Sequence, residues 1–200
     1  MRISGIVKDS IVDGPGLRLV IFFQGCKHNC KGCHNPDTHD PQGGYEESII
    51  KVLDMIKEDP LIEGVTLSGG DPLEQPVSCY NLCRRIKEFN PDVSIWLYTG
   101  YTYEYIQGSY NEDWDKLLQY IDVLVDGPFV ELLKSYDLHF RGSSNQRLID
   151  VKASRDNEHV VLYQSNYSNL DKFHIPEWLH ICMRYDLNLQ WSFAYLLISK

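Results

Sequence analysis

The sequence lacks the features that mark membrane proteins and nucleic-acid-binding proteins. None of its apolar runs approaches the roughly 20 residues that a membrane-spanning helix needs, and no apolar leader stands at its start. Basic residues are outnumbered, because 19 Lys and Arg stand against 28 Asp and Glu and give a net charge of -9. Such a balance argues against binding to a phosphate backbone as the main activity. We therefore expect a cytoplasmic protein that has neither a membrane nor a nucleic acid as a partner.

Over most of the chain, cysteine and histidine are too scattered to suggest a site. Cys79 and Cys83 lie four residues apart on an expected helix, where they are more typical of core thiols than of ligands, and Cys182 stands alone. The seven histidines form no H-x-x-x-H pair. No pair of side chains suggests general acid–base catalysis, so we predict no catalytic residue beyond those that hold a cofactor.

The other three cysteines are concentrated in one short stretch. Cys26, Cys30 and Cys33 follow an apolar run at residues 19–23 in a C-x-x-x-C-x-x-C spacing. Soft thiolates at this spacing can converge on one metal centre. We favour a 4Fe-4S cluster that these three cysteines bind, with one iron left open to a small molecule.

Two alternatives compete with the cluster. Disulfides are disfavoured, because six cysteines in a chain without a signal peptide suggest a reducing compartment. Zinc would need a fourth ligand, and the sequence lacks the second ligand pair that structural zinc sites usually have. A nearby histidine could supply that ligand: His28, His34 or His39.

Apolar runs and amphipathic segments alternate along the chain. Residues 2–7, 17–23, 64–67, 94–98 and 121–125 are expected strands, and residues 49–56 and 77–89 are expected helices, with a more polar helical region ending near residue 118. This alternation predicts an α/β fold of βα units with a mostly parallel sheet. Polar or glycine-rich loops follow four of these strands, beginning near residues 24, 68, 99 and 126. They should meet at the carboxyl edge of the sheet, where ligands bind in such folds.

The cysteine stretch resembles the cluster loop of radical S-adenosylmethionine (radical SAM) enzymes. Many of these enzymes have an aromatic residue before the third cysteine, where this chain has Gly32. Residues 32–36 (GCHNP), together with residues 13–16 (DGPG), resemble the activating proteins of anaerobic ribonucleoside-triphosphate reductase. Residues 122–127 and 141–147 also resemble segments of that family, and the likeness covers about residues 1–151.

The resemblance implies a fold and a set of cofactor-binding residues. The fold would be an incomplete (β/α) barrel of the radical SAM type, with an activase domain at residues 1–155 and a C-terminal extension of unassigned role at 156–200. The glycine-rich residues 68–72 (SGGDP) would hold S-adenosylmethionine, and a bulky side chain at Gly70 is then expected to block that ligand without displacing the cluster. The expected cofactor-binding residues are Gly32, Cys33, His34, Gly69, Gly70, Asp71 and Thr99.

The resemblance also implies a reaction. A flavodoxin or ferredoxin would reduce the 4Fe-4S cluster, and S-adenosylmethionine would be cleaved to methionine and a 5′-deoxyadenosyl radical. That radical would take a hydrogen atom from a glycine of the partner, the glycyl-radical subunit of anaerobic ribonucleoside-triphosphate reductase. Alternatives are an activase of another glycyl-radical enzyme such as pyruvate formate-lyase, a small radical SAM synthase acting on a nucleobase precursor, or a zinc- or cluster-bearing binding module.

Overall fold

The computed structural model describes residues 1–164, and Met1–Tyr163 form one compact unit. Cys182 and most of the expected extension 156–200 lie outside the described residues. The strands are β1 (Arg2–Ser10), β2 (Arg18–Phe23), β3 (Tyr45–Glu46), β4 (Gly64–Gly69), β5 (Ser94–Tyr98), β6 (Val123–Asp126) and β7 (Arg147–Asp150). The helices are α1 (Ile49–Glu58), α2 (Pro76–Phe89), α3 (Tyr103–Gly108), α4 (Glu112–Leu118) and α5 (Val151–Asp156).

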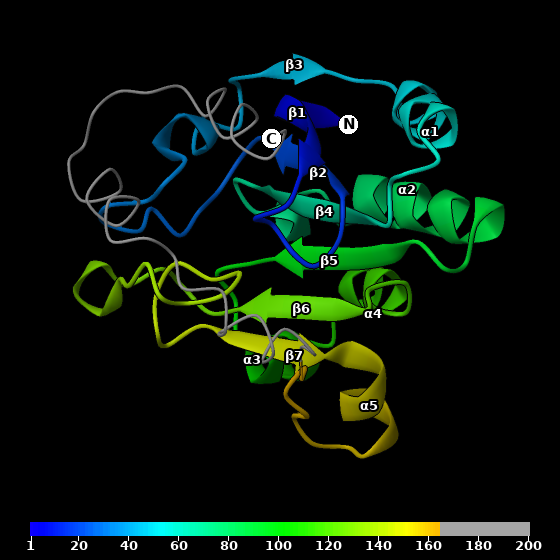
Figure 1. The fold of residues 1–200 in the computed structure, drawn as a ribbon. Coiled ribbons are helices and arrows are strands. Elements are labelled where there is room, and N and C mark those ends of the chain that lie inside the picture. The colour runs from blue at the N-terminus through cyan, green and yellow to red at the C-terminus, as the bar shows by residue number, and fades with distance from the viewer. Residues whose placement is uncertain (165–200) are drawn as a thin grey trace, which may run out of the picture. The chain divides into compact units, whose positions relative to one another are not determined.

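In residues 1–164 all seven strands belong to one sheet, with the order β3-β1-β2-β4-β5-β6-β7 (Figure 1). The central strands β2, β4, β5 and β6 are neighbours and run parallel. On one side β1 pairs antiparallel with β2 and with β3, and on the other side β7 pairs antiparallel with β6. The prediction of a mixed α/β fold with a mostly parallel central sheet is therefore confirmed. The four parallel strands all end at the same edge of the sheet, where the loops that follow them were predicted to meet.

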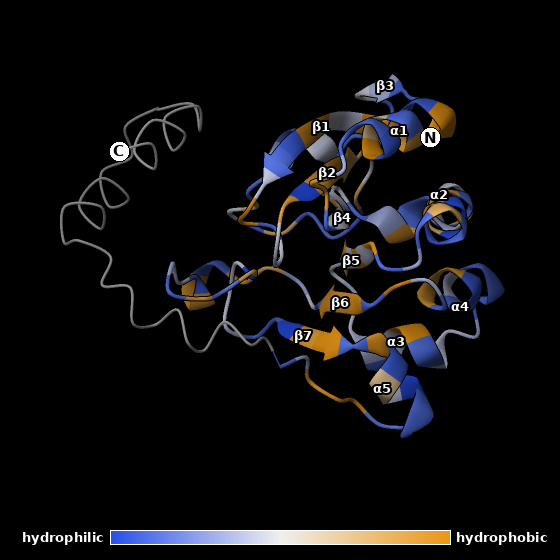
Figure 2. Ribbon diagram, turned by 45° about the vertical axis from the view of Figure 1, so that its right-hand side comes forward, coloured by the Kyte–Doolittle hydropathy of each residue, from blue (hydrophilic) through white to orange (hydrophobic). Residues whose placement is uncertain are grey.

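The two faces of the sheet bury different side chains. Leu19, Ile21 and Phe23 of β2 pack in the large core, which also contains apolar residues of α1, α2 and α4. Trp96 of β5 faces the other way and packs in a smaller cluster with Val123 and Val125 of β6. Figure 2 shows the helices gathered on one side of the sheet, with their apolar and polar residues on different faces. Burial on both faces explains why these strands read as continuous apolar runs.

Several elements differ from the sequence-based expectations, and β3 and α5 were not predicted. The polar helical region before residue 118 consists of two short helices, α3 and α4. The strand expected at residues 2–7 extends to Ser10 as β1 and pairs on both sides, with β2 and with β3. Strand β7 was not predicted at all, because only Leu148 and Ile149 of its four residues are apolar.

Arg18 at the start of β2 is a charged residue that the core encloses completely. Its Nε donates to Thr66 Oγ1 (2.7 Å), its Nη1 to Ser94 Oγ (2.8 Å) and to Pro15 O (3.1 Å), and its Nη2 to Val65 O (2.8 Å). Burial lowers the pKa of Arg18 to about 10, so the guanidinium stays charged at neutral pH. The side chain thus joins the turn at residues 13–16 to three parallel strands.

We expect Arg18→Met to lower the free energy of unfolding by at least about 2 kcal/mol, because it leaves buried carbonyl oxygens without a donor. Chemical denaturation of the full chain measures this loss. Arg84→Met is the matched control, because Arg84 makes an i,i+4 ion pair with Glu88 on the surface of α2. This variant should cost less than about 1 kcal/mol. Equal losses in the two variants would contradict a structural role for the buried guanidinium.

Candidate metal centre

The cysteine loop, residues 24–40, leaves the sheet at the carboxyl end of β2, and hydrogen bonds between its own backbone groups hold its two ends together. Gly25 N donates to Thr38 O (2.8 Å) and Cys26 N to His39 O (3.1 Å), so the two ends of the loop run side by side. The Gln24 side chain donates from Nε2 to Asp37 O (3.0 Å) and Asp40 O (2.7 Å). The loop therefore presents its cysteines from a fixed base.

The five cysteines of the described part fall into two groups. Cys26, Cys30 and Cys33 are unpaired and partly exposed, whereas Cys79 and Cys83 are unpaired and buried. Burial raises the pKa of both Cys79 and Cys83, which keeps these thiols protonated, and Cys79 Sγ donates to Pro72 O at 3.3 Å. Only the first group is placed to bind a metal from solution.

The environment of the loop sulfurs suits thiolate ligands. Burial raises the pKa of Cys26, and the nearby backbone of His28 and Asn29 acts in the opposite direction. Asn35 N donates to Cys33 Sγ at 3.4 Å. Backbone N–H groups directed at cysteine sulfur are a usual feature of iron–sulfur sites. Soft thiolates on one closed loop therefore fit a cluster with three cysteine ligands.

Across residues 1–164, the geometry does not bring any three His, Cys, Asp or Glu side chains close enough to hold a single metal ion. Hollows flank the loop on two sides. One, of about 340 Å³, lies beside Cys26 and is also lined by Glu74 and Gln75. The other, of about 310 Å³, lies between Phe22 and His34.

The glycine pair at the end of β4 packs tightly under the cysteine loop. Gly70 N donates to Phe23 O (2.8 Å) and Asp71 N to Gly25 O (2.8 Å), so the β4 end is hydrogen-bonded to the start of the loop. A Cβ on Gly70 would overlap the Gly25 carbonyl and would lie 2.9 Å from Thr38 O. Gly69, the last residue of β4, has a positive φ of 99°. The pair thus has a packing role, and contact with S-adenosylmethionine stays a prediction.

Asp71 and Thr99, which lie on different strand ends, are brought together by the fold. Thr99 Oγ1 donates to Asp71 Oδ2 at 2.8 Å, and His28 Nε2 lies 2.8 Å from the same oxygen. Asp71 is completely buried. Its carboxylate therefore joins β4 and β5 to the cysteine loop.

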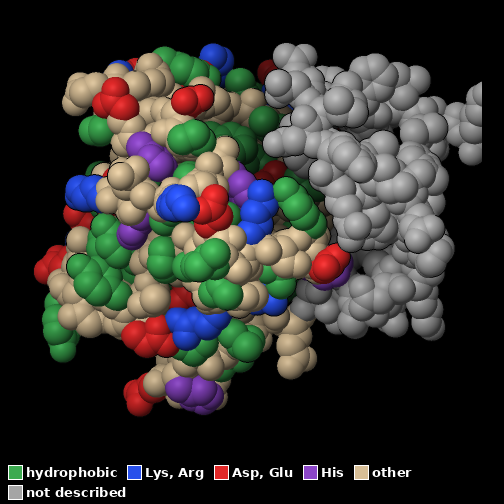
Figure 3. Space-filling view, turned by 90° about the vertical axis from the view of Figure 1, so that its left-hand side faces the viewer, with side chains coloured by type: hydrophobic (Ala, Val, Ile, Leu, Met, Phe, Trp, Pro, Cys, Tyr) green, Lys and Arg blue, Asp and Glu red, His purple; other side chains and the backbone are tan. Residues whose placement is uncertain are grey.

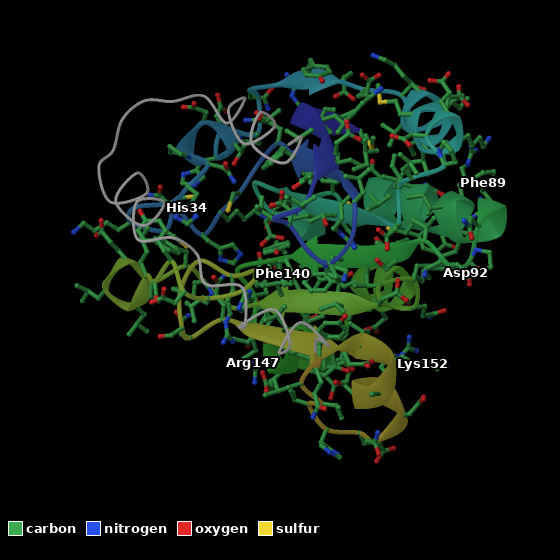
Figure 4. All side chains as sticks on the ribbon, viewed as in Figure 1. His34, Phe89, Asp92, Phe140, Arg147 and Lys152 are labelled. Carbon is green, nitrogen blue, oxygen red and sulfur yellow. The ribbon has the colours of Figure 1, made fainter. Side chains whose placement is uncertain are left out.

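Gly32 and His34, the other expected cofactor-binding residues, contact a different segment. Gly32 lies beside Glu131, and the His34 ring packs against Phe129 with 4.9 Å between ring centroids. Figure 4 places His34 on the side of the molecule toward which strands β5 and β6 run. Burial lowers the pKa of His34, and nearby Lys134 adds to this effect, which favours a neutral imidazole. The segment after β6 thus covers one flank of the cysteine loop.

Residues 141–147 (RGSSNQR) are held by bonds within the chain. Gln146 Oε1 accepts from Gly142 N (3.0 Å), and Gln146 Nε2 donates to Gly127 O (3.1 Å). Arg147, labelled in Figure 4, donates to Glu104 and to the buried carboxylate of Asp126. These contacts fold the segment against the end of β6.

Charges of both signs surround the loop. Figure 3 shows basic, acidic and histidine side chains interspersed on this face. Lys27 pairs with Glu74 at 2.6 Å and Lys31 with Glu131 at 3.1 Å, although both lysine side chains are largely exposed. Exposed pairs of this kind contribute only about 0–1 kcal/mol each.

Sequence reasoning missed residues that support the loop from other elements. Tyr101 packs its ring against His28 with 4.4 Å between ring centroids, and its hydroxyl donates to Glu74 Oε1 at 2.9 Å. Neither residue lies in a recognisable motif. The sequence offers only their position as a clue, because each follows closely after the end of a strand.

Among the helices of residues 1–164, none is long and apolar enough to cross a membrane.

Comparison with known proteins places this site in a class. The model of a family described as a 4Fe-4S single cluster domain matches residues 12–149, which include all three loop cysteines. The chain is similar to anaerobic ribonucleoside-triphosphate reductase-activating proteins of several organisms. It is 39% identical to the one from Vibrio cholerae over 142 residues, which are 68% of this chain and 89% of that protein. It is 37% identical to the one from Enterobacteria phage T4 over 152 residues, 74% of this chain and 93% of that protein.

A third relative, from Escherichia coli K12, is 38% identical over 146 residues, with 68% of this chain and 90% of that protein covered. The chain belongs to the family of anaerobic ribonucleoside-triphosphate reductase-activating proteins. The resemblance inferred from residues 13–16 and 32–36 is thereby confirmed.

Proposed function

We propose that this protein activates an anaerobic ribonucleoside-triphosphate reductase, the activity that the names of its relatives state for them. One observation carries the proposal: the chain belongs to that family, and its three loop cysteines are partly exposed on a loop closed by backbone hydrogen bonds. Cys26, Cys30 and Cys33 would hold a 4Fe-4S cluster. Cys79 and Cys83 are excluded as ligands in this proposal because they are buried in the core.

The cofactor chemistry is part of the proposal. Once bound and reduced by a flavodoxin or ferredoxin, the cluster would supply the electron that cleaves S-adenosylmethionine, and the 5′-deoxyadenosyl radical so formed would take hydrogen from a reductase glycine. The protein's own residues would hold the cluster and position the ligand. Two strand ends beside the cysteine loop would form the ligand site, and they contribute Gly69, Gly70, Asp71 and Thr99. Their place at the carboxyl ends of parallel strands, where ligands bind in such folds, supports this assignment.

The wider architecture fits a large substrate. We interpret the sheet as an incomplete (β/α) barrel, in which β3 and β7 stand at the two ends of the strand order. An open sheet leaves the carboxyl ends of the parallel strands accessible to a loop of another protein. We therefore propose a protein glycine as the site of hydrogen abstraction.

Reconstitution with the reductase tests this function. The anaerobically purified chain should contain about four iron and four sulfide ions, as a 4Fe-4S site requires. Mixed with reductant, S-adenosylmethionine and the cognate reductase, it should produce a glycyl-radical doublet in electron paramagnetic resonance (EPR) and nucleotide reduction. The Cys30→Ala chain is the control and should produce neither. Zinc in place of iron, or a doublet only on a formate-lyase-type partner, would overturn the assignment.

A further inference from the structure

Strand β1 leaves part of its outer edge without a partner strand. On its inner side it pairs with β2, whereas on its outer side β3 pairs with it only at Arg2 and Ile3. Across residues 1–164, no strand therefore pairs with the outer edge of residues 4–7. The regular strand conformation is interrupted soon after them, because Asp9 has a positive φ of 60°. An unpaired edge presents backbone N–H and C=O groups with which another extended chain can pair.

The same four residues form one wall of a groove. The groove has a volume of about 310 Å³, and it is also lined by Phe22 of β2 and by residues 34–38 of the cysteine loop. Phe22 alternates with Ile21 and Phe23, which pack in the large core, so it faces the side of the sheet opposite the helices (Figure 2). Gly5 pairs with Phe22 and faces the same side. A Cβ on Gly5 would meet no atom within 4 Å, so the space above this residue is open.

The groove lies next to the proposed cluster. One of its lining residues is His34, which directly follows Cys33 in the chain. A segment that lay along β1 would therefore come beside one of the proposed cluster ligands. Phe22 and the exposed Val7 give this groove apolar surface that such a segment could cover.

The free edge suits a segment whose central residue is a glycine. Because glycine has no side chain, a partner cannot recognise it through a side-chain pocket. Pairing along a strand edge supplies main-chain hydrogen bonds that do not depend on the side chain, while the flanking side chains give specificity. An added strand directs alternate side chains to the face of the groove, where the open space above Gly5 leaves room for one.

We propose that residues 4–7 of β1, with the groove beside them, are the docking site for the glycine-bearing segment of the reductase, which adds to the sheet as an extended strand. The proposal rests on the proposed function, since it takes the reductase as the partner. It goes further by assigning a surface to that partner and a mode of recognition. The segment would pair with the edge of β1 and reach the cysteine loop at His34.

A matched pair of tryptophan variants tests the docking site. Gly5→Trp fills the groove, whereas Gly108→Trp adds the same side chain at the exposed last residue of α3, where a Cβ also meets no atom within 4 Å. In full-length protein with its cluster reconstituted, Gly5→Trp should weaken binding to the cognate reductase at least about tenfold, because the indole clashes with the docked segment. The glycyl-radical doublet in EPR should weaken with it. Gly108→Trp should bind like the wild type, as measured by anaerobic calorimetric titration.

Peptide copies of the reductase segment test the strand pairing without altering the protein. Two copies carry N-methyl groups on alternate residues, one on the odd and the other on the even positions. Neighbouring residues of a strand direct their N–H groups to opposite edges, so only one of the two copies loses the donors that face β1. That copy should compete with the reductase at least about tenfold less well than the unmodified peptide, and the other copy should compete equally well.

Several outcomes would overturn the inference while the proposed function stands. These are wild-type affinity for the reductase in Gly5→Trp, an unmodified peptide that fails to compete, and equal competition by the two methylated copies. Loss of S-adenosylmethionine binding in Gly5→Trp would assign the groove to the cofactor instead. A changed oligomeric state with unchanged reductase binding would assign the edge to a second copy of this chain. A wild-type chain that binds the reductase through this edge but never forms the doublet would refute the proposed function alone.

Discussion

Replacing Cys30 with alanine is expected to remove essentially all iron from the anaerobically purified protein, and Cys26→Ala and Cys33→Ala should do the same. Each variant leaves two thiolates on the loop, and in the described part the other cysteines are buried in the core, too far inside to substitute. Loss of one of three protein ligands also exposes the remaining iron to exchange with water. Iron and sulfide analysis, with the visible absorption of the cluster, measures the effect.

Cys79→Ala provides the matched control for these variants. Cys79 is fully buried on α2, so its replacement should leave the iron content unchanged and lower the free energy of unfolding by about 1 kcal/mol through the small cavity it creates. Full iron retention in Cys30→Ala would remove that residue from the site. Iron loss in Cys79→Ala at unchanged stability would indicate that the core thiol is a ligand after all.

The parallel sheet could be predicted because its strands carry a strong local signal. Residues 19–23, 64–67 and 94–98 are apolar and short, and the structure buries them on both faces of the sheet. Once these strands are parallel neighbours, their carboxyl ends must share an edge. That step, made from the sequence, correctly placed the cysteine loop beside the ends of β4 and β5.

Strand β7 could not be predicted from its own residues. It follows a polar, glycine-containing segment, and its extended conformation depends on pairing with β6. In that pairing Leu148 lies opposite Val125, and Ile149 lies opposite Leu124. The backbone beyond α5 adds to this edge, because Tyr163 N donates to Leu148 O at 2.8 Å. A contact partner far along the chain, and not local propensity, decides that these residues are extended.

The site shows the same division between local and long-range information. The three cysteines could be identified because their spacing is itself the signal. The neighbours of Asp71 could not, since His28 and Thr99 lie 43 and 28 residues away along the chain. A motif that resembles a ligand-binding sequence suggested that this carboxylate meets a cofactor. In the structure its oxygens accept hydrogen bonds from Leu73 N, Thr99 Oγ1 and Gly100 N, and contact with a cofactor stays a prediction.

The structure also changes the expected result of substituting Gly70. From the sequence alone, a bulky side chain there is expected to block S-adenosylmethionine and to leave the cluster in place. Even one methyl group, however, would overlap the carbonyl of Gly25, whose oxygen accepts a hydrogen bond from Asp71 N. Neither backbone can move without breaking the contact between β4 and the cysteine loop. We therefore expect a side chain at this position to lower the free energy of unfolding by about 3 kcal/mol, as overpacking does.

Gly70→Ala is therefore expected to displace the cysteine loop, to lower the melting temperature of the cluster-free protein and to reduce its iron content severely after reconstitution. Gly70→Val should be at least as damaging. Gly5→Ala is the control, because a Cβ at Gly5 of β1 meets no atom within 4 Å, and this variant should keep its stability and its iron. Thermal unfolding of the cluster-free chains and iron analysis of the reconstituted ones separate the two glycines. If Gly70→Val kept its full iron and failed only to bind S-adenosylmethionine, the loop contact would be adaptable, and direct contact between Gly70 and the ligand would be the better explanation of the glycine.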